Sequence, residues 1–168
     1  MALTLRFSLH QADGIPSCGG AVDNTPAGII ANTSPLNSVF DKVLKHENIA
    51  GSTEYRLLYL CNDASQSQKV YTPRLKLIST PDSEIALGAL TKNAVGATIS
   101  SEKETPSGVV FKTQASLNSE SGGYLSFPDG EELAPGEFLG FWVRRKVSSS
   151  SGSGTIKEEI VLEVQYRS

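Results

Sequence analysis

The side chains that most often carry out catalysis or hold metal ions are scarce in this sequence. It has two histidines, His10 and His46, and two cysteines, Cys18 and Cys61. A serine-nucleophile triad needs a histidine base, and the G-x-S-x-G pattern of a nucleophile elbow is absent. Two histidines without a C-x-x-C pair give no ligand spacing typical of a zinc site. We therefore expect no metal and no other cofactor.

Paired carboxylates are the remaining route to hydrolytic chemistry. Glu131–Glu132 and Glu158–Glu159 are adjacent in the sequence. Neighbouring residues on a strand point to opposite faces, so neither pair is expected to converge on one substrate bond. The glycine motifs that bind phosphate groups are also missing. The sequence therefore favours a binding or structural role, and we expect neither enzymatic activity nor catalytic residues.

Length and charge narrow the class of protein further. The chain has 168 residues, with 15 basic and 18 acidic side chains and a net charge of −3. This length suits one domain, and the acidic balance disfavours direct binding of nucleic acid. No apolar run approaches the roughly 18 residues of a membrane span, and the first residues lack the pattern of a secretory signal. We expect a protein that binds neither nucleic acid nor membrane.

Apolar runs indicate β-strands along most of the chain. Residues 3–9 alternate with period two, which is typical of a half-buried strand. Residues 55–61 are mostly apolar, which predicts a central strand covered on both faces. Pro73 interrupts the run 70–78 and indicates an edge strand or a bulge. Further strands are predicted at 85–90, 138–145 and 156–166, with weaker candidates at 97–100, 108–111 and 124–127.

The N-terminal part combines an irregular stretch with one helix signal. Residues 13–35 are rich in glycine and proline, so we predict an extended arm or a long ordered loop. Ser34 can cap a helix that ends near Gly51. The apolar positions of this helix would share one face: Leu36, Val39, Phe40, Val43 and Leu44. Near the other end of the chain, residues 148–154 (SSSSGSG) predict a mobile hairpin tip.

These patterns favour an all-β antiparallel sandwich, of the jelly-roll or immunoglobulin-like kind, with an extended N-terminal arm and at most one short helix. Residues 1–50 would supply the first strand, the arm and the helix, and residues 51–168 the sandwich core of a single domain. Trp142 and Cys61 lie in well-defined strands, so we expect both to be buried. A sandwich that binds carbohydrate or a receptor is an alternative, but it would need an exposed aromatic platform.

The one basic cluster of the sequence is Arg144-Arg145-Lys146. In a strand, its side chains would divide between the two faces. The cluster either contacts an acidic partner or protects an edge strand against aggregation, and the second interpretation is favoured.

Three stretches resemble a known family when they are taken together. They are residues 51–62 (GSTEYRLLYLCN), 105–111 (TPSGVVF) and 133–145 (LAPGEFLGFWVRR). This order is similar to small β-sandwich virion proteins of tailed bacteriophages. In those proteins a G-x-T-E-Y-R run opens a strand that ends in Asn, and an L-x-P-G-E turn leads into a W-[VL]-R-R strand. The likeness spans residues 50–166.

The resemblance implies a non-enzymatic virion protein that decorates or cements the capsid shell through contacts with the major capsid protein. The neck, tail and baseplate use similar domains. It further implies assembly into the virion in the cytoplasm of the host bacterium, with other virion proteins or further copies of the chain as partners. The predicted partner-binding residues are Cys18, Gly19, Gly20, Ile29 and Ile30 in the arm, together with Arg144 and Arg145.

Overall fold

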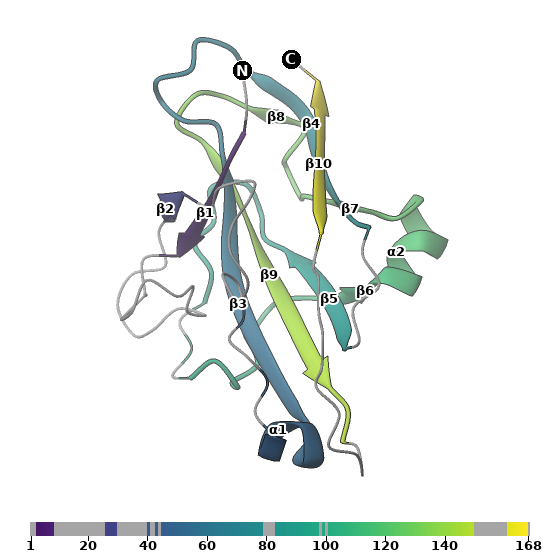
Figure 1. Ribbon diagram of the computed structural model, residues 1–168. Coiled ribbons are helices and arrows are strands. Elements are labelled where there is room, and N and C mark those ends of the chain that lie inside the picture. The colour runs from purple at the N-terminus through teal and green to yellow at the C-terminus, as the bar shows by residue number, and fades with distance from the viewer. Residues whose placement is uncertain are drawn as a thin grey trace.

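Two antiparallel sheets form the body of the protein (Figure 1). The computed structural model describes residues 3–8, 26–29, 40, 43, 45–78, 83–97, 99, 101–149 and 161–167. Within them, the central sheet has the strand order β2 (Pro26–Ile29), β1 (Thr4–Ser8), β3 (Ser52–Cys61), β9 (Phe138–Val147), β5 (Glu84–Ala89) and β6 (Lys112–Thr113). The outer sheet has the order β10 (Leu162–Arg167), β4 (Val70–Leu77) and β7 (Tyr124–Ser126), and β8 (Glu132–Leu133) also pairs with β4. The predicted all-β sandwich class is confirmed.

The pairing of β3 with β9 forms the centre of the central sheet. The two strands are in register over all their residues, from Ser52 opposite Val147 to Cys61 opposite Phe138. One face of the pair, which includes Leu58 and Phe141, packs into the core between the two sheets. That core also contains Leu75 of β4 and Leu125 of β7, and strand β10 packs against it. The predicted central strand is therefore confirmed, with a partner of equal length.

The opposite face of β3 and β9 is also buried. Leu57, Tyr59 and Trp142 pack there against a covering segment, which comprises residues 90–97, 99 and 101–111. Trp142 is 0% exposed and Cys61 is 6% exposed, so the expected burial of both side chains is confirmed. A Cβ on Gly96 would lie 2.5 Å from Leu57 Cδ2, so glycine allows the covering segment to approach the sheet closely. The candidate strand at 108–111 was wrong, because these residues lie in an irregular part of this segment. Of the candidate strand at 97–100, Ala97 and Ile99 lie outside any strand, and the other two residues lie outside the described part of the chain.

Strand β4 contains a bulge next to Pro73. Gln165 lies opposite Arg74 and Arg167 opposite Tyr71, so β4 has one more residue than β10 between these pairs. Thr72, within the bulge, has a φ of 46°, which is uncommon for a β-branched residue. Strand β4 lies between β10 and β7, so the predicted bulge is correct and the predicted edge strand is not.

Two short helices accompany the sheets. Helix α1 (Lys45–Ala50) ends before Gly51, as predicted, but it begins later than the sequence pattern indicates. Phe40 and Val43 lie outside any helix. Phe40 is buried against the guanidinium groups of two arginines, so tertiary packing decides its conformation instead of helical periodicity. The proposed cap at Ser34 lies outside the described residues.

Helix α2 (Gln114–Ser121) was not predicted from the sequence and exceeds the expected single helix. Thr113 caps its first turn by accepting a hydrogen bond from the Ser116 N–H, and Gly122 ends it in the left-handed conformation with a φ of 64°. Leu117 is its one buried residue, so the helix has no apolar periodicity by which to recognise it.

The C-terminal strands do not form the predicted hairpin. Strand β9 belongs to the central sheet, whereas β10 pairs with β4 in the outer sheet. The chain therefore crosses from one sheet to the other between them, and most of residues 148–154 lie outside the described residues. No helix in the described part of the chain is both long enough and apolar enough to cross a membrane.

We predict that Leu58→Ala lowers the free energy of unfolding by about 3 kcal/mol, because it leaves a cavity at a fully buried position between the sheets. The measurement is urea denaturation followed by tryptophan fluorescence. Val110→Ala is the control, since Val110 is 75% exposed and its loss should change the free energy by less than about 0.5 kcal/mol. Equal effects of the two substitutions would contradict the described core.

Candidate interaction surface

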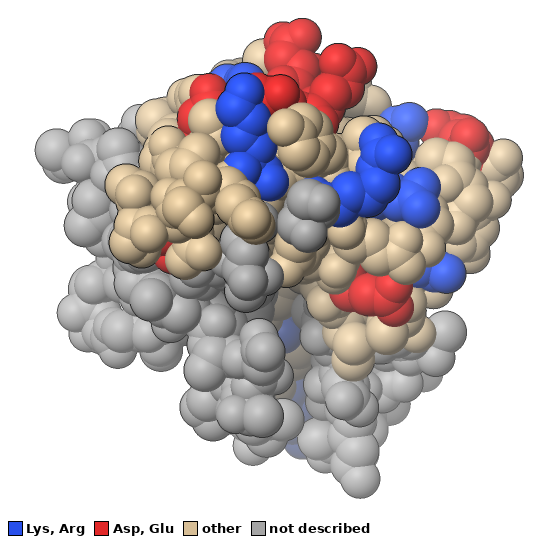
Figure 2. Space-filling view, turned by 90° about the horizontal axis from the view of Figure 1, so that it is seen from above, with Lys and Arg blue, Asp and Glu red and all other residues tan. Residues whose placement is uncertain are grey.

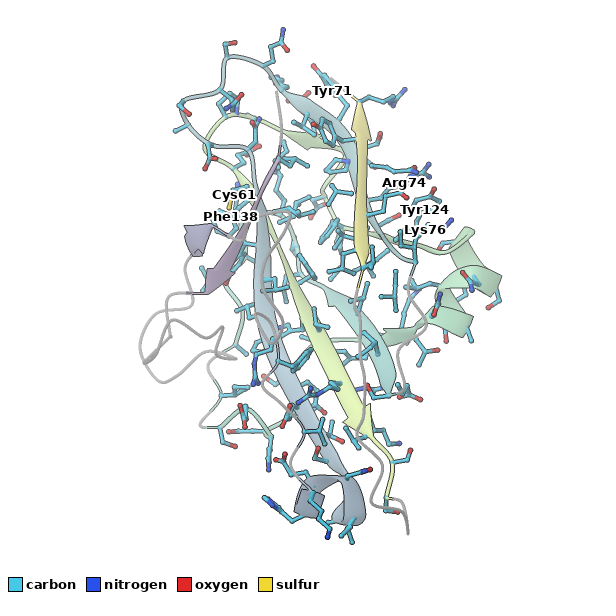
Figure 3. All side chains as sticks on the ribbon, viewed as in Figure 1. Cys61, Tyr71, Arg74, Lys76, Tyr124 and Phe138 are labelled. Atoms are coloured by element: carbon cyan, nitrogen blue, oxygen red, sulfur yellow. The ribbon has the colours of Figure 1, made fainter. Side chains whose placement is uncertain are left out.

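The outward face of the outer sheet combines aromatic and basic side chains. Leu75 and Leu77 of β4 point into the core, so the alternate residues of the strand point outward. We call this surface the basic–aromatic face, and define it by five residues from β4, β7 and β10: Tyr71, Arg74, Lys76, Tyr124 and Arg167. Figure 3 places Arg74, Lys76 and Tyr124 close together beside β4, with Tyr71 near the start of the strand.

Arg74 is held in place by two neighbouring strands. Its guanidinium carbon lies 3.9 Å from the centre of the Tyr124 ring, at a stacking distance. On the other side, Arg74 Nη2 donates a hydrogen bond of 3.1 Å to Gln165 Oε1 on β10. Stacking and hydrogen bonding together reduce the conformational freedom that an exposed arginine would otherwise lose on binding.

Lys76 lies on the same aromatic ring. It is directly opposite Tyr124 in the strand register, and its Nζ is 5.3 Å from the ring centre. Gly123, next to Tyr124, has a φ of 93°, a conformation that favours glycine, and a Cβ there would lie 2.9 Å from Asn118 Oδ1 and 3.3 Å from Lys76 Cε. Arg167, opposite Tyr71, donates from Nε to Thr72 Oγ1 at 3.3 Å. The basic–aromatic face therefore carries three cations: Arg74 and Lys76 on β4, and Arg167 on β10.

Most of the other described cations are paired with carboxylates. Ion pairs join Arg56 to Glu102, Lys69 to Glu132, Lys92 to Glu137, Lys103 to Glu47, Lys112 to Glu120, Arg144 to Glu84 and Arg145 to Glu54. Five described Lys and Arg side chains make no ion pair with a described carboxylate: Lys45, Arg74, Lys76, Lys146 and Arg167. Three of these five lie on the basic–aromatic face, which is therefore positive on an acidic protein.

The face of the molecule seen from above carries charges of both signs. Basic and acidic side chains of the described residues lie beside one another on this face (Figure 2). The described part of this face therefore has no extended positive surface of the kind that follows a nucleic-acid backbone.

The two arginines of the predicted partner-binding set have different surroundings. Arg144 pairs with Glu84 of β5 at 2.5 Å, and its guanidinium carbon lies 5.5 Å from the ring centre of Phe111 in the covering segment. Arg145, its neighbour, is only 4% exposed and pairs with the buried Glu54. The predicted division between two faces is thus confirmed, and Arg145 offers no surface to a partner. Strand β9 is central, so the cluster does not protect a sheet edge.

Arg145 belongs to a buried cluster of charges at one end of the β3–β9 pair. Arg145 Nη2 donates to Glu54 Oε2 at 2.5 Å, and Arg56 pairs with Glu102 at 2.8 Å. Both guanidinium groups lie on the ring of Phe40, at 4.7 Å for Arg145 and 5.1 Å for Arg56. Burial raises the pKa of Glu54, and the charge of Arg145 opposes that shift. Glu54, Arg56 and Arg145 are almost fully buried, whereas the Glu102 side chain is 37% exposed. The buried Arg145–Glu54 pair therefore has a structural role.

The arm residues of the predicted set are mostly outside the described part of the chain. This applies to Cys18, Gly19, Gly20 and Ile30. Ile29 ends strand β2, where its Cα lies opposite that of Arg6 in β1. The role of the arm in binding stays a prediction. Among the described residues, no group of three or more His, Cys, Asp and Glu side chains is arranged to hold a metal ion.

The turn before β9 is joined to the end of β3 by hydrogen bonds. Asn62 donates from Nδ2 to the Leu133 carbonyl at 2.9 Å, and its own carbonyl accepts from the Gly136 N–H. Within the turn, Glu137 accepts from the Ala134 N–H at 2.7 Å. This hydrogen bond lowers the pKa of Glu137, and a nearby lysine, Lys92, acts in the same direction.

No protein-family model, curated protein or solved structure matches this chain.

We predict that Arg145→Gln lowers the free energy of unfolding by about 3–5 kcal/mol, because it leaves the Glu54 carboxylate buried without its partner. Arg144→Gln is the matched control. It removes the neighbouring arginine, whose partner Glu84 is exposed, and should cost about 1 kcal/mol or less. Urea denaturation measures both, and equal losses would contradict the structural role of Arg145.

The same variant should respond to pH in a defined direction. The pKa of Glu54 is raised in the folded protein, so its ionised form destabilises the fold as the pH rises through that pKa. Without Arg145 this penalty grows, so the deficit of Arg145→Gln should be smaller near pH 4 than near pH 8. A deficit that does not change with pH would show that Glu54 is not the group responsible.

The substitution Glu137→Gln tests how much the hydrogen bond from the Ala134 N–H to the Glu137 carboxylate stabilises the turn before β9. Because the folded state lowers the pKa of Glu137, the carboxylate stabilises the protein above its unfolded pKa, and this contribution is lost as the pH falls through the folded pKa. We expect a loss of about 1 kcal/mol at pH 7 that shrinks below about pH 4. Thermal denaturation across this pH range is the measurement, with the exposed Glu131→Gln as the control. A loss that is the same at both ends of the range would exclude an ionised Glu137 as its source.

Proposed function

We propose that the protein is a non-enzymatic structural component of a tailed-bacteriophage virion. In this role it decorates or cements the capsid shell through contacts with the major capsid protein. The basic–aromatic face carries the proposal, because it is an outward surface of a paired sheet whose three cations make no ion pair with a described carboxylate. Repeated on a symmetric lattice, many weak contacts of this kind give strong attachment.

The arrangement of the three motif stretches supports the resemblance as one unit. Residues 51–62 contain β3, and residues 133–145 contain the turn and most of β9, its partner strand. Residues 105–111 lie in the covering segment, where Phe111 is 5.4 Å from Tyr55 between ring centres. Asn62, the last residue of the first stretch, hydrogen-bonds to the turn of the third. The likeness therefore falls on a contiguous part of the fold.

The neck, tail and baseplate are alternative locations for the same structural role. A second function is favoured by one observation. Tyr71 is 39% exposed and Tyr124 is half-buried on the outer sheet, and exposed aromatic rings are a common feature of carbohydrate sites. The buried Trp142 cannot supply such a platform. Specific binding on a glycan array that is lost in Tyr71→Ala would support this alternative.

Immunogold electron microscopy tests the proposed function. Antibody raised against the recombinant protein would be applied to particles purified from a lysate of the source bacterium. We expect gold over the whole head if the protein decorates or cements the shell. Gold confined to the junction of head and tail, or to the tail tip, would move the protein to the neck or baseplate.

Two controls make the labelling decisive. Particles from a strain that lacks the gene should bind no gold. Antibody that has first been absorbed with the recombinant protein should not label any particles. Intact particles without label, from a lysate in which the antibody detects the protein, would overturn the proposal.

A further inference from the structure

We propose that the basic–aromatic face binds an extended acidic segment of a partner protein, with Arg74 and Lys76 pairing alternate carboxylates of that segment. This proposal rests on the proposed function in one respect, since it requires a protein partner. It goes further by naming the chemistry of that partner and the residues that recognise it.

The donors of Arg74 are arranged before any partner binds. A guanidinium group has five N–H donors in a planar fork, which matches the two oxygens of a carboxylate. One hydrogen bond, to Gln165 Oε1, is made within the described protein, and the ring of Tyr124 supports the plane of the group. The remaining donors of this exposed side chain are available to an anion. A carboxylate that binds them meets a group that is already ordered.

The spacing of the cations favours an extended chain. Arg74 and Lys76 are two residues apart on β4, which places their Cα atoms about 7 Å apart on the same face. Alternate side chains of an extended peptide repeat at the same distance. Arg167 lies beyond the bulge at Thr72, on the neighbouring strand β10, and does not share this spacing. A segment with acidic residues at every second position can therefore meet Arg74 and Lys76 in turn.

The intervening and flanking groups fit a polypeptide. The rings of Tyr71 and Tyr124 lie among the cations and offer apolar area for the uncharged part of a peptide. Glu163 of β10 lies opposite Lys76 and makes no ion pair with a described cation, whereas the Glu132 carboxylate is neutralised by Lys69. The Glu163 carboxylate and the net charge of −3 repel a continuous polyanion such as nucleic acid. A short segment with separated charges avoids most of that repulsion.

Fluorescence anisotropy with the full-length protein tests this proposal. The probe is a labelled synthetic peptide of alternating Glu and Ser residues. The matched probe has the same composition and charge, but its Glu residues form one block. We expect the alternating peptide to bind several times more tightly, and roughly 0.5 M NaCl to abolish most of the binding because screening at that concentration acts within a few ångströms.

Substitutions identify the residues involved. Arg74→Gln should weaken binding of the alternating peptide about tenfold, and Lys76→Gln about threefold. Tyr124→Leu removes no charge but removes the support of Arg74, so it should also weaken binding about threefold. Lys146→Gln is the control: it removes an exposed cation without an ion pair from β9, and should leave affinity within about twofold. Circular dichroism would verify the fold of each variant.

The outcomes separate this proposal from the proposed function. If Arg74→Gln and Lys146→Gln weaken peptide binding equally, only the net charge of the protein matters, and the proposed acidic-segment site is overturned. The site is also overturned if the two peptides bind with equal affinity, or if a double-stranded DNA fragment binds more tightly than the alternating peptide. If neither peptide binds while the antibody labels intact particles, the proposed virion role is supported and the proposed acidic partner is rejected. If the alternating peptide binds but the particles are not labelled, only the virion role is rejected.

Discussion

The burial of β3 and β9 on both of their faces is the constraint on which the rest of the structure depends. The outer sheet covers one face of the pair, and the covering segment covers the other. Strands in such a position must be apolar along most of their length, and any charge they carry must find a partner inside. Glu54, Arg56 and Arg145 meet this requirement at one end of the pair, where Phe40 lies against both guanidinium groups. At this end of the β3–β9 pair, ion pairs and cation–π contacts thus take the place of the apolar contacts that pack the middle of the two strands.

The outer sheet is under a different constraint, because the described part of the chain covers only one of its faces. Its inward residues fill the core, and its outward residues are free to serve recognition. Arg74 and Arg145 illustrate the contrast. Arg145 is neutralised within the fold, whereas Arg74 is ordered by Tyr124 and Gln165 without being neutralised. A side chain that is positioned by a sheet but lacks a counter-charge suits binding better than one on a loose loop, because less freedom is lost when a partner arrives.

Much of the strand pattern could be predicted from the sequence, because alternation and apolar runs report burial directly. The runs at 55–61 and 138–145 predict strands that are found as parts of β3 and β9. Helix α2 could not be predicted, since Leu117 is its one buried residue and its ends depend on Thr113 and Gly122. The helix pattern around Phe40 failed for the opposite reason, because an apolar side chain can be buried without helical periodicity. The basic–aromatic face was missed because Arg74, Lys76 and Tyr124 are brought together by strand pairing, which local sequence does not reveal. Arg144 and Arg145 were grouped by their adjacency, whereas the sheet separates their surroundings.

The order of β3 and β9 along the chain has a consequence for how the molecule is made. Strand β3 lies in the first half of the sequence, but its central partner is complete only at Val147, and β5, β4, α2 and β7 all lie between them. During synthesis, the apolar run of β3 is therefore made long before β9, and it cannot pair with β9 until most of the remaining chain has been translated. Contacts between such distant segments form slowly, and a waiting apolar strand is prone to associate with others. Charged residues beside an apolar strand are a common means of limiting such association, and Glu54 and Arg56 lie near the start of β3.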